Sequence, residues 1–215
     1  MKRDFDFYEF AAIILPGMIV LLFVAYIIPS TKGALLEGRV SVGEFGVLIL
    51  LSYVCGHLVQ AVSNVWEPSF WRVQHGMPTN WICLKNQKLL SESQVTKLAV
   101  SVKERISGTF PDKLEGLQIS KWRGAPSQMY VAVRSEGRAG RIDTFNGNYG
   151  LLRGIVSAML VIAMITLLVP VHPVRRILVV VGLIAALALF RMRRFAIHYA
   201  HELFVQFLHL PISKA

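Results

Sequence analysis

The sequence is poor in cysteine and acidic residues and carries no familiar catalytic motif. Cys55 and Cys83 are its only cysteines in 215 residues, which argues against a disulfide framework and indicates a reducing location. It has no Gly-x-Ser-x-Gly, Walker, Cys-x-x-Cys or His-Glu-x-x-His sequence, the patterns that mark hydrolases, nucleotide-binding, redox and zinc proteins. We therefore expect no catalytic residues, no cofactor and no metal, and predict that the chain is not an enzyme.

Two polar groups are the alternatives to this view. His198, His201 and Glu202 lie within one and a half helical turns, but the order His-x-x-His-Glu is neither the zincin order nor its inverse, and zinc needs a further ligand. Asp143, Asn146 and Asn148 precede an apolar run and would suit an enzyme acting at the membrane surface. Ion pairs and helix-end hydrogen bonds explain the second group more simply.

Long apolar runs are what the sequence does contain. They are Phe10–Ile28, Val42–Val62, Ile155–Val171 and Ile177–Phe190. Each is close to the length needed to cross a hydrocarbon layer of ~30 Å. We predict an all-α membrane protein with four transmembrane helices in two hairpins and a mostly helical cytoplasmic insert between helices 2 and 3. The predicted segments are residues 1–64 for the first hairpin, 65–149 for the insert, and 150–215 for the second hairpin with a C-terminal amphipathic helix.

Two of the runs depart from an ordinary span. Pro16 falls inside the first and predicts a bend near Ile13–Pro16, because proline removes a backbone hydrogen bond and clashes with the preceding turn. Only fourteen apolar residues separate Arg176 from Arg191 in the fourth, about 21 Å of helix. Either the flanking arginines extend toward the headgroups or the bilayer thins, and a re-entrant segment is the alternative.

Basic residues indicate the orientation of these spans. The 23 Lys and Arg outnumber the 13 Asp and Glu, and they concentrate near the N-terminus, in the insert and in the C-terminal tail. By the positive-inside rule these three regions are cytoplasmic, so we predict a multi-pass protein of the bacterial inner membrane. The first run is not expected to be a cleavable signal, because acids and bases are mixed before it and no small-x-small site follows it.

The second run carries polar and small residues that set it apart. They are Tyr53, His57, Gln60 and Asn64 on one predicted helical face, with Ser52 and Gly56 beside it. Polar side chains at membrane depth favour contact with protein. The face could line a pore or a proton-responsive contact through His57, or it could provide structural hydrogen bonds between helices.

The insert contains one clear helix and one ambiguous segment. Ser91 and Gln94 fit a capping box, and Gly108 fits a C-terminal stop, so an amphipathic helix is predicted between them. Met129–Val133 could be a short strand or part of a helix, and the helix is favoured because no partner strand is apparent.

Arginines near the predicted span ends are candidates for contact with membrane lipid or with a protein partner. They are Arg134, Arg138, Arg141, Arg153, Arg191, Arg193 and Arg194. Anionic lipid attracts juxtamembrane arginine by ~1 kcal/mol each, which accounts for these residues without direct binding of nucleic acid.

In the segments RIDTFNGNYGLLRG and SYVCGHLVQAVSN the chain resembles a loose class of bacterial inner-membrane proteins with four spans and a cytoplasmic helical insert. Its arrangement and length also resemble the membrane subunits, KwaA, of Kiwa antiphage defence systems. That resemblance implies a sensor of phage attack that assembles with itself and with a cytoplasmic partner, KwaB, which acts on phage DNA. We therefore expect an oligomeric inner-membrane sensor or scaffold that recruits a soluble partner. The alternative is an oligomeric pore or membrane-disrupting effector.

Overall fold

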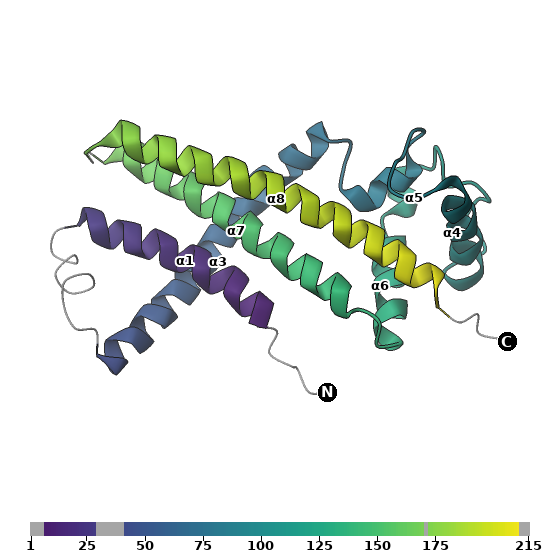
Figure 1. Cartoon of the computed structure of the whole chain (residues 1–215), viewed down its shortest axis with the longest axis horizontal. Helices are drawn as coiled ribbons and strands as arrows, with labels where there is room; N and C mark the ends of the chain where they lie inside the picture. The colour runs from purple at the N-terminus through teal and green to yellow at the C-terminus, as the bar shows by residue number, and fades with distance from the viewer. Residues whose placement is uncertain (1–6, 29–40, 170–171, 211–215) are drawn as a thin grey trace. The chain divides into compact units, whose positions relative to one another are not determined.

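The computed structural model describes residues 7–28, 41–169 and 172–210, and every regular element in these ranges is a helix (Figure 1). The elements are α1 (Phe7–Ile27), α3 (Val42–Val73), the 3-10 helix η2 (Pro78–Cys83), α4 (Glu92–Arg105), α5 (Ile119–Trp122), α6 (Ala125–Ser135), α7 (Gly140–Leu168) and α8 (Val174–Leu208). The predicted all-α class is thus confirmed for these ranges.

Three helical segments are long and apolar enough to cross a membrane. They are Phe10–Ile27, Val42–Cys83 and Gly140–Leu168. The fourth apolar run lies in α8, a single helix of 35 residues. Its longest uncharged segment is the fourteen residues between Arg176 and Arg191, so the structure supports a membrane protein with three such helices and leaves the fourth span as a prediction.

The chain divides into two compact units, each built from separate parts of the sequence. Unit 1 comprises Met1–Ser69 and Gly147–Arg193, and unit 2 comprises Phe70–Asn146 and Arg194–Ala215. The sequence analysis places residues 150–215 in one segment, whereas the last part of α8 groups with the insert. Helix α8 therefore contributes to both units.

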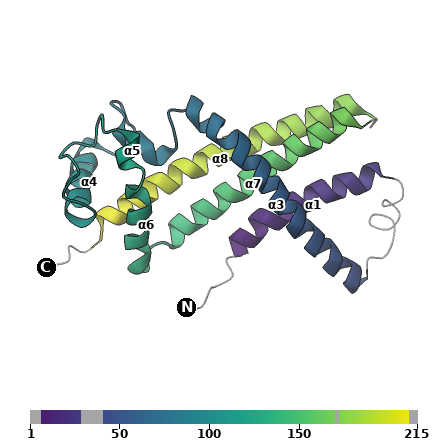
Figure 2. The same cartoon turned by 180° about the vertical axis from the view of Figure 1, so that it is seen from behind.

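Unit 1 contains α1, most of α3, α7 after its first turns and the first half of α8. Helices α7 and α8 lie side by side and antiparallel in both views, while α3 crosses α1 (Figures 1 and 2). One core draws on all four helices. Its buried members are Val20, Val59, Ala158, Met159, Ile162 and Val181.

Unit 2 has a separate apolar core around the last turns of α8. Its largest fully buried side chains include Leu98 from α4, Trp122 from α5, Met129 from α6, and Phe204 and Phe207 from α8. The Trp122 ring nitrogen donates to the Thr79 carbonyl at 2.8 Å. The buried indole therefore loses no hydrogen bond on leaving water.

Two arginines donate hydrogen bonds to the backbone carbonyls at the C-terminal end of α8. Arg105 donates to the carbonyls of Phe207 and Leu210 at 3.0 and 2.9 Å, and Arg138 donates to the carbonyl of His209 at 2.6 Å. The last carbonyls of a helix lack intrahelical donors and carry partial negative charge, which a guanidinium satisfies. These contacts attach the end of α8 to unit 2.

Local predictions for the insert are confirmed. Ser91 caps α4, accepting from the Gln94 backbone while the Gln94 side chain accepts from the Ser91 backbone. Met129–Val133 is helical and belongs to α6. Pro16 lies inside α1, and the bend near it stays a prediction.

Candidate functional site

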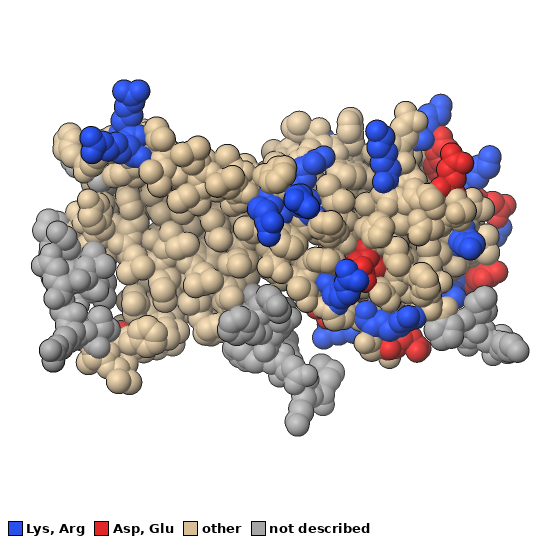
Figure 3. Space-filling model, in the orientation of Figure 1, with Lys and Arg blue, Asp and Glu red and all other residues tan. Residues whose placement is uncertain are grey.

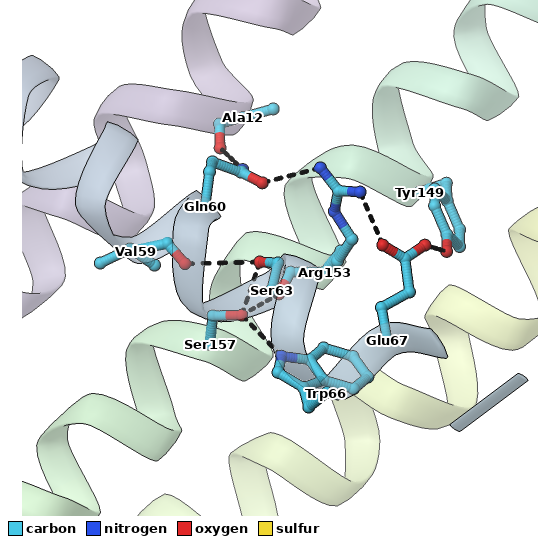
Figure 4. Close-up of polar contacts among 9 residues, drawn as sticks. All are labelled: Ala12, Val59, Gln60, Ser63, Trp66, Glu67, Tyr149, Arg153 and Ser157. Atoms are coloured by element: carbon cyan, nitrogen blue, oxygen red, sulfur yellow. Dashed lines mark hydrogen bonds and ion pairs between the residues drawn. The ribbon is translucent and has the colours of Figure 1, made fainter. Parts of the chain in front are cut away.

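The candidate site is a network of polar side chains that joins α1, α3 and α7 within unit 1, and it begins at Pro16. Proline has no backbone N–H, so the carbonyl four residues earlier loses its helical donor. That carbonyl belongs to Ala12, and the Gln60 side chain of α3 donates to it at 3.0 Å (Figure 4). The interruption of one helix is thus satisfied by a side chain from another, as a low-dielectric environment requires.

The same glutamine connects to a buried ion pair. The Oε1 atom of Gln60 accepts from Arg153 Nη2 at 2.9 Å, and Arg153 Nη1 lies 2.7 Å from Glu67 Oε2. Tyr149 donates to the other oxygen of Glu67. The Arg153 and Glu67 side chains are only 26% and 15% exposed. Hydrogen bonds from a neutral donor and a cation therefore surround the carboxylate, the arrangement in which a buried charge is tolerated.

A second hydrogen-bonded group extends the contact between α3 and α7. The hydroxyls of Ser63 and Ser157 lie 2.6 Å apart, and Trp66 donates to Ser157 at 2.8 Å. Ser63 also donates to the Val59 carbonyl at 3.4 Å. Figure 4 shows both groups on facing sides of the two helices.

Glycine allows the three helices to approach closely enough for this network. A Cβ atom on Gly154 would lie 2.6 Å from the ring of Pro16 and 3.0 Å from the Gln60 amide nitrogen. A Cβ on Gly56 would lie 2.1 Å from the Ile13 carbonyl oxygen. Small residues at helix contacts are common in membrane proteins because they permit backbone contact.

The network is suited to fixing helix positions and holding opposite charges together. The Nε atom of Arg153 is buried and has no hydrogen-bond partner, so part of the cost of burying its charge is not recovered. Within residues 7–28, 41–169 and 172–210, no group of three or more His, Cys, Asp or Glu is arranged to hold a metal ion.

The predicted polar face of α3 divides between two sides of the helix. Ser52 and Gly56 are buried and Gln60 joins the network, whereas Tyr53, His57 and Asn64 are exposed. The rings of Tyr53 and His57 meet edge to face with their centroids 4.6 Å apart. Within a single chain the packed side of α3 is centred on Ser52, Gly56 and Ser63, and a protein or pore contact of Tyr53, His57 and Asn64 stays a prediction.

Most of the arginines predicted to contact lipid or a partner are exposed, whereas Arg153 is partly buried. Arg134 donates to the Tyr130 hydroxyl at 3.1 Å, and Arg141 lies 3.8 Å from Glu202 while its side chain stays 73% exposed. Arg138 is the residue that caps α8. Arg153 is bound by Glu67 and Gln60 inside unit 1, and its contact with lipid or a partner stays a prediction. The remaining three residues, Arg191, Arg193 and Arg194, are exposed on α8.

The C-terminal histidines do not converge with Glu202. His198 stacks on Phe145 with ring centroids 5.5 Å apart, and Glu202 accepts from Gln206 at 2.8 Å. The nearby Tyr130 hydroxyl donates to Asp143 at 2.6 Å. Burial, together with that carboxylate, raises the pKa of Tyr130 to about 12.

Sequence reasoning missed Glu67, Tyr149 and the serine pair. One signal for Glu67 was present, because it is the only acidic residue between Glu44 and Glu92 and lies seven positions after Gln60, on the same helical face. Pairing it with Arg153, 86 positions later, required the structure.

Comparisons with known proteins give no relative from which to transfer a function. No protein-family model matches the sequence, and no curated protein and no solved structure matches it either.

Proposed function

We propose that the chain is a non-catalytic membrane scaffold or sensor that assembles with further copies of itself and recruits a soluble cytoplasmic partner. The observation that carries this proposal is the exposed polar stripe of α3, formed by Tyr53, His57 and Asn64. The stripe lies on a helix long and apolar enough to cross a membrane. Protein rather than hydrocarbon is the environment that suits it.

Self-assembly follows from how little of α3 its own chain covers. Only 17% of its apolar window is buried, against 33% for α1 and 39% for α7. Hydrocarbon offers no hydrogen-bond partner, so exposed polar side chains at this depth favour contact with protein. Phenol, imidazole and amide groups each donate and accept. A stripe made of them can pair with the same stripe on a second copy, as a two-fold contact requires.

The proposed topology has four crossings in a bacterial inner membrane, with the N-terminus, the insert and the C-terminus cytoplasmic. The three long helices and the apolar first half of α8 support it. The exposed Arg191, Arg193 and Arg194 follow that half directly, at the end the positive-inside rule assigns to the cytoplasm.

Unit 2 is the proposed recruiting surface. It has an apolar core of its own, and Arg134, Arg138 and Arg141 are exposed on it while each is held by a neighbouring group. Side chains ordered in this way lose less conformational entropy on binding. An acidic surface on a soluble protein is the complementary partner.

The resemblance to Kiwa membrane subunits adds the biological role to this proposal. In that role the protein senses phage attack at the membrane and passes it to a KwaB-like partner. Contact with phage DNA then belongs to the partner, which agrees with the absence of any nucleic-acid motif in this sequence.

Native mass spectrometry of the full chain in detergent tests self-assembly. We expect a defined oligomer that Tyr53→Leu with His57→Leu weakens, because both side chains are exposed and their loss leaves the chain's own packing intact. His201→Leu, an exposed histidine of unit 2, is the matched control and should leave the oligomer unchanged. A strictly monomeric wild type would overturn the proposal.

Co-purification with the soluble protein encoded beside it tests recruitment. Arg134→Glu and Arg141→Glu together should release the partner and retain the oligomer, and Arg138 is left unchanged because it holds the end of α8. A partner that stays bound to this variant would refute the assignment of the surface.

A pore is the second candidate function, and the same stripe favours it. In a ring of copies Tyr53, His57 and Asn64 could face water instead of a neighbouring subunit. Ion flux through vesicles containing the purified protein separates the two functions. A scaffold leaves the vesicles sealed, whereas a pore conducts and His57→Leu lowers the conductance.

A further inference from the structure

Exposed arginines lie at both ends of the apolar first half of α8. The distance between the two pairs along the helix is short for a membrane span. Arg175 and Arg176 precede the uncharged segment, and Arg191 and Arg193 follow it, all four exposed. The fourteen residues between Arg176 and Arg191 belong to one continuous helix, so their length is fixed at roughly 21 Å. That is about 9 Å less than an average hydrocarbon layer.

Helix α7 beside it is 29 residues long and is apolar enough to cross a membrane. Its Arg153 does not reach headgroups, because Glu67 and Gln60 hold it inside unit 1 at 2.7 and 2.9 Å. The short segment of the hairpin is therefore that of α8.

Packing between α7 and α8 prevents one helix from sliding along the other to match a thicker hydrocarbon layer. Ala158, Met159 and Ile162 of α7 and Val181 of α8 share one buried core. Sliding one helix along the other would break this contact.

Helix α3 of unit 1 has no such limit. Its uncharged part runs from Phe45 to Trp66, roughly 33 Å of helix. Unit 1 thus combines a segment of ordinary length in α3 with one about one third shorter in α8.

We propose that the α7–α8 hairpin binds lipid phosphates of both leaflets through its arginines and selects thin, anionic bilayer. The proposal rests on the four-crossing topology proposed above. Guanidinium groups bind phosphate in a bidentate manner, and long basic side chains reach outward to headgroups while their stems cover apolar surface. Met192 is buried between Arg191 and Arg193, so the two arginines emerge on the outer sides of the helix.

The surface of unit 1 agrees with this binding mode. In Figure 3 an uncharged band separates one group of basic side chains from another on the visible face. Val179, Leu183 and Leu187 of α8 are exposed in the uncharged segment. Apolar groups between two basic ends match a thin hydrocarbon layer bounded by two layers of phosphate.

Quenching of a tryptophan by brominated lipid measures the preferred thickness. The reporter is Leu187→Trp in the full chain, placed in phosphatidylcholine vesicles whose acyl chains range from 14 to 22 carbons. The signal of the parent chain, which has four tryptophans of its own, is subtracted. We expect association with 14-carbon lipid to be severalfold tighter than with 22-carbon lipid. Adding phosphatidylglycerol should strengthen association further.

Variants then test which effects depend on arginine itself and which need only a positive charge at these positions. Arg191→Leu with Arg193→Leu lengthens the uncharged segment, so the preference should move to longer chains and the gain from phosphatidylglycerol should fall. Arg191→Lys with Arg193→Lys should keep the thickness optimum. Lys85→Leu with Lys88→Leu removes two exposed charges of unit 2 and should change neither quantity.

Labelling of the hairpin turn keeps this test distinct from that of the topology. His172→Cys in a chain without Cys55 and Cys83 should react with an impermeant maleimide added outside intact cells. If the cysteine is labelled in intact cells but association with vesicles is tightest at acyl chains of 18 to 20 carbons, the thickness preference is overturned and the topology is retained. Absence of labelling in cells, with labelling after lysis, would overturn both.

Discussion

Removal of the buried cation in the network is the sharpest test of what holds unit 1 together. In Arg153→Met the Glu67 carboxylate keeps Tyr149 as a donor but loses the guanidinium that pairs with it, and Gln60 Oε1 loses its Arg153 donor. Methionine is similar in length to the arginine stem, so the change removes charge and hydrogen bonds and leaves little cavity.

The magnitude follows from the burial of the pair. Breaking a fully buried ion pair costs ~3–5 kcal/mol, because it leaves an uncompensated charge. Arg153 is 26% and Glu67 15% exposed, and Tyr149 still donates to the carboxylate, so we expect a loss of about 2–3 kcal/mol. Adding Glu67→Leu removes the orphaned charge. The double variant should therefore be less destabilised than the sum of the two single ones by more than ~1 kcal/mol.

An exposed pair in the same chain provides the control. Lys103 Nζ lies 2.6 Å from Asp112 Oδ1, but these side chains are 43% and 83% exposed. Lys103→Met should cost less than about 1 kcal/mol despite the shorter distance. The two ion pairs have similar distances, so a difference between Arg153→Met and Lys103→Met in unfolding free energy reports on burial.

Equilibrium unfolding of the full chain in mixed micelles, followed by far-ultraviolet circular dichroism, measures these differences. The reasoning is refuted if Arg153→Met is no more destabilising than Lys103→Met. It is also refuted if the effects of Arg153→Met and Glu67→Leu simply add.

Two further predictions concern close packing and titration. Gly56→Ala places a methyl group 2.1 Å from the Ile13 carbonyl oxygen and should lower the unfolding free energy by at least about 2 kcal/mol in the same assay. Gly182→Ala meets no atom within 4 Å and should be neutral or stabilising. Equal effects of the two substitutions would refute the close contact at Gly56. Burial and Asp143 raise the pKa of Tyr130 to about 12, so the absorbance at 295 nm lost in Tyr130→Phe should appear near pH 12. Its appearance near pH 10 would refute the burial of this hydroxyl beside Asp143. Since the folded pKa lies above the unfolded one, the stability from neutral Tyr130 is present below about pH 10 and lost as the pH rises through 12.

Local sequence signals predicted the helices well because they act over a few residues. The pairing of Ser91 with Gln94 fixes where α4 begins, and the absence of a partner strand correctly favoured helix at Met129–Val133. Both arguments need only the neighbouring chain.

The packed side of α3 could not be predicted in this way. Polar or small residues occur on two adjacent faces of this helix, so periodicity does not choose between Ser52 and Tyr53 as the inward position. The choice depends on α1, where Pro16 frees a carbonyl that Gln60 can reach. The pairing of Arg153 with Glu67 was missed for the same reason, since Glu67 lies in a distant part of the sequence.

Helix α8 follows two opposite burial patterns along its length, and the change locates an environmental boundary. Between Arg176 and Arg191 most of the exposed residues are large and apolar. They are Val179, Val180, Leu183, Ile184, Leu187 and Phe190. In its second half the apolar residues are fully buried in unit 2, as Leu203, Phe204 and Phe207 show.

A row of exposed apolar side chains is unfavourable in water and favourable in lipid, whereas buried apolar residues with a polar exterior suit water. Both patterns occur on one unbroken helix, so the proposed topology assigns its first half to lipid and its last turns to water. In that topology the boundary falls at Arg191–Arg194, where cations suit the phosphate layer. The burial pattern of α8 thus supports the proposed fourth crossing independently of the resemblance and of the orientation rule for charges.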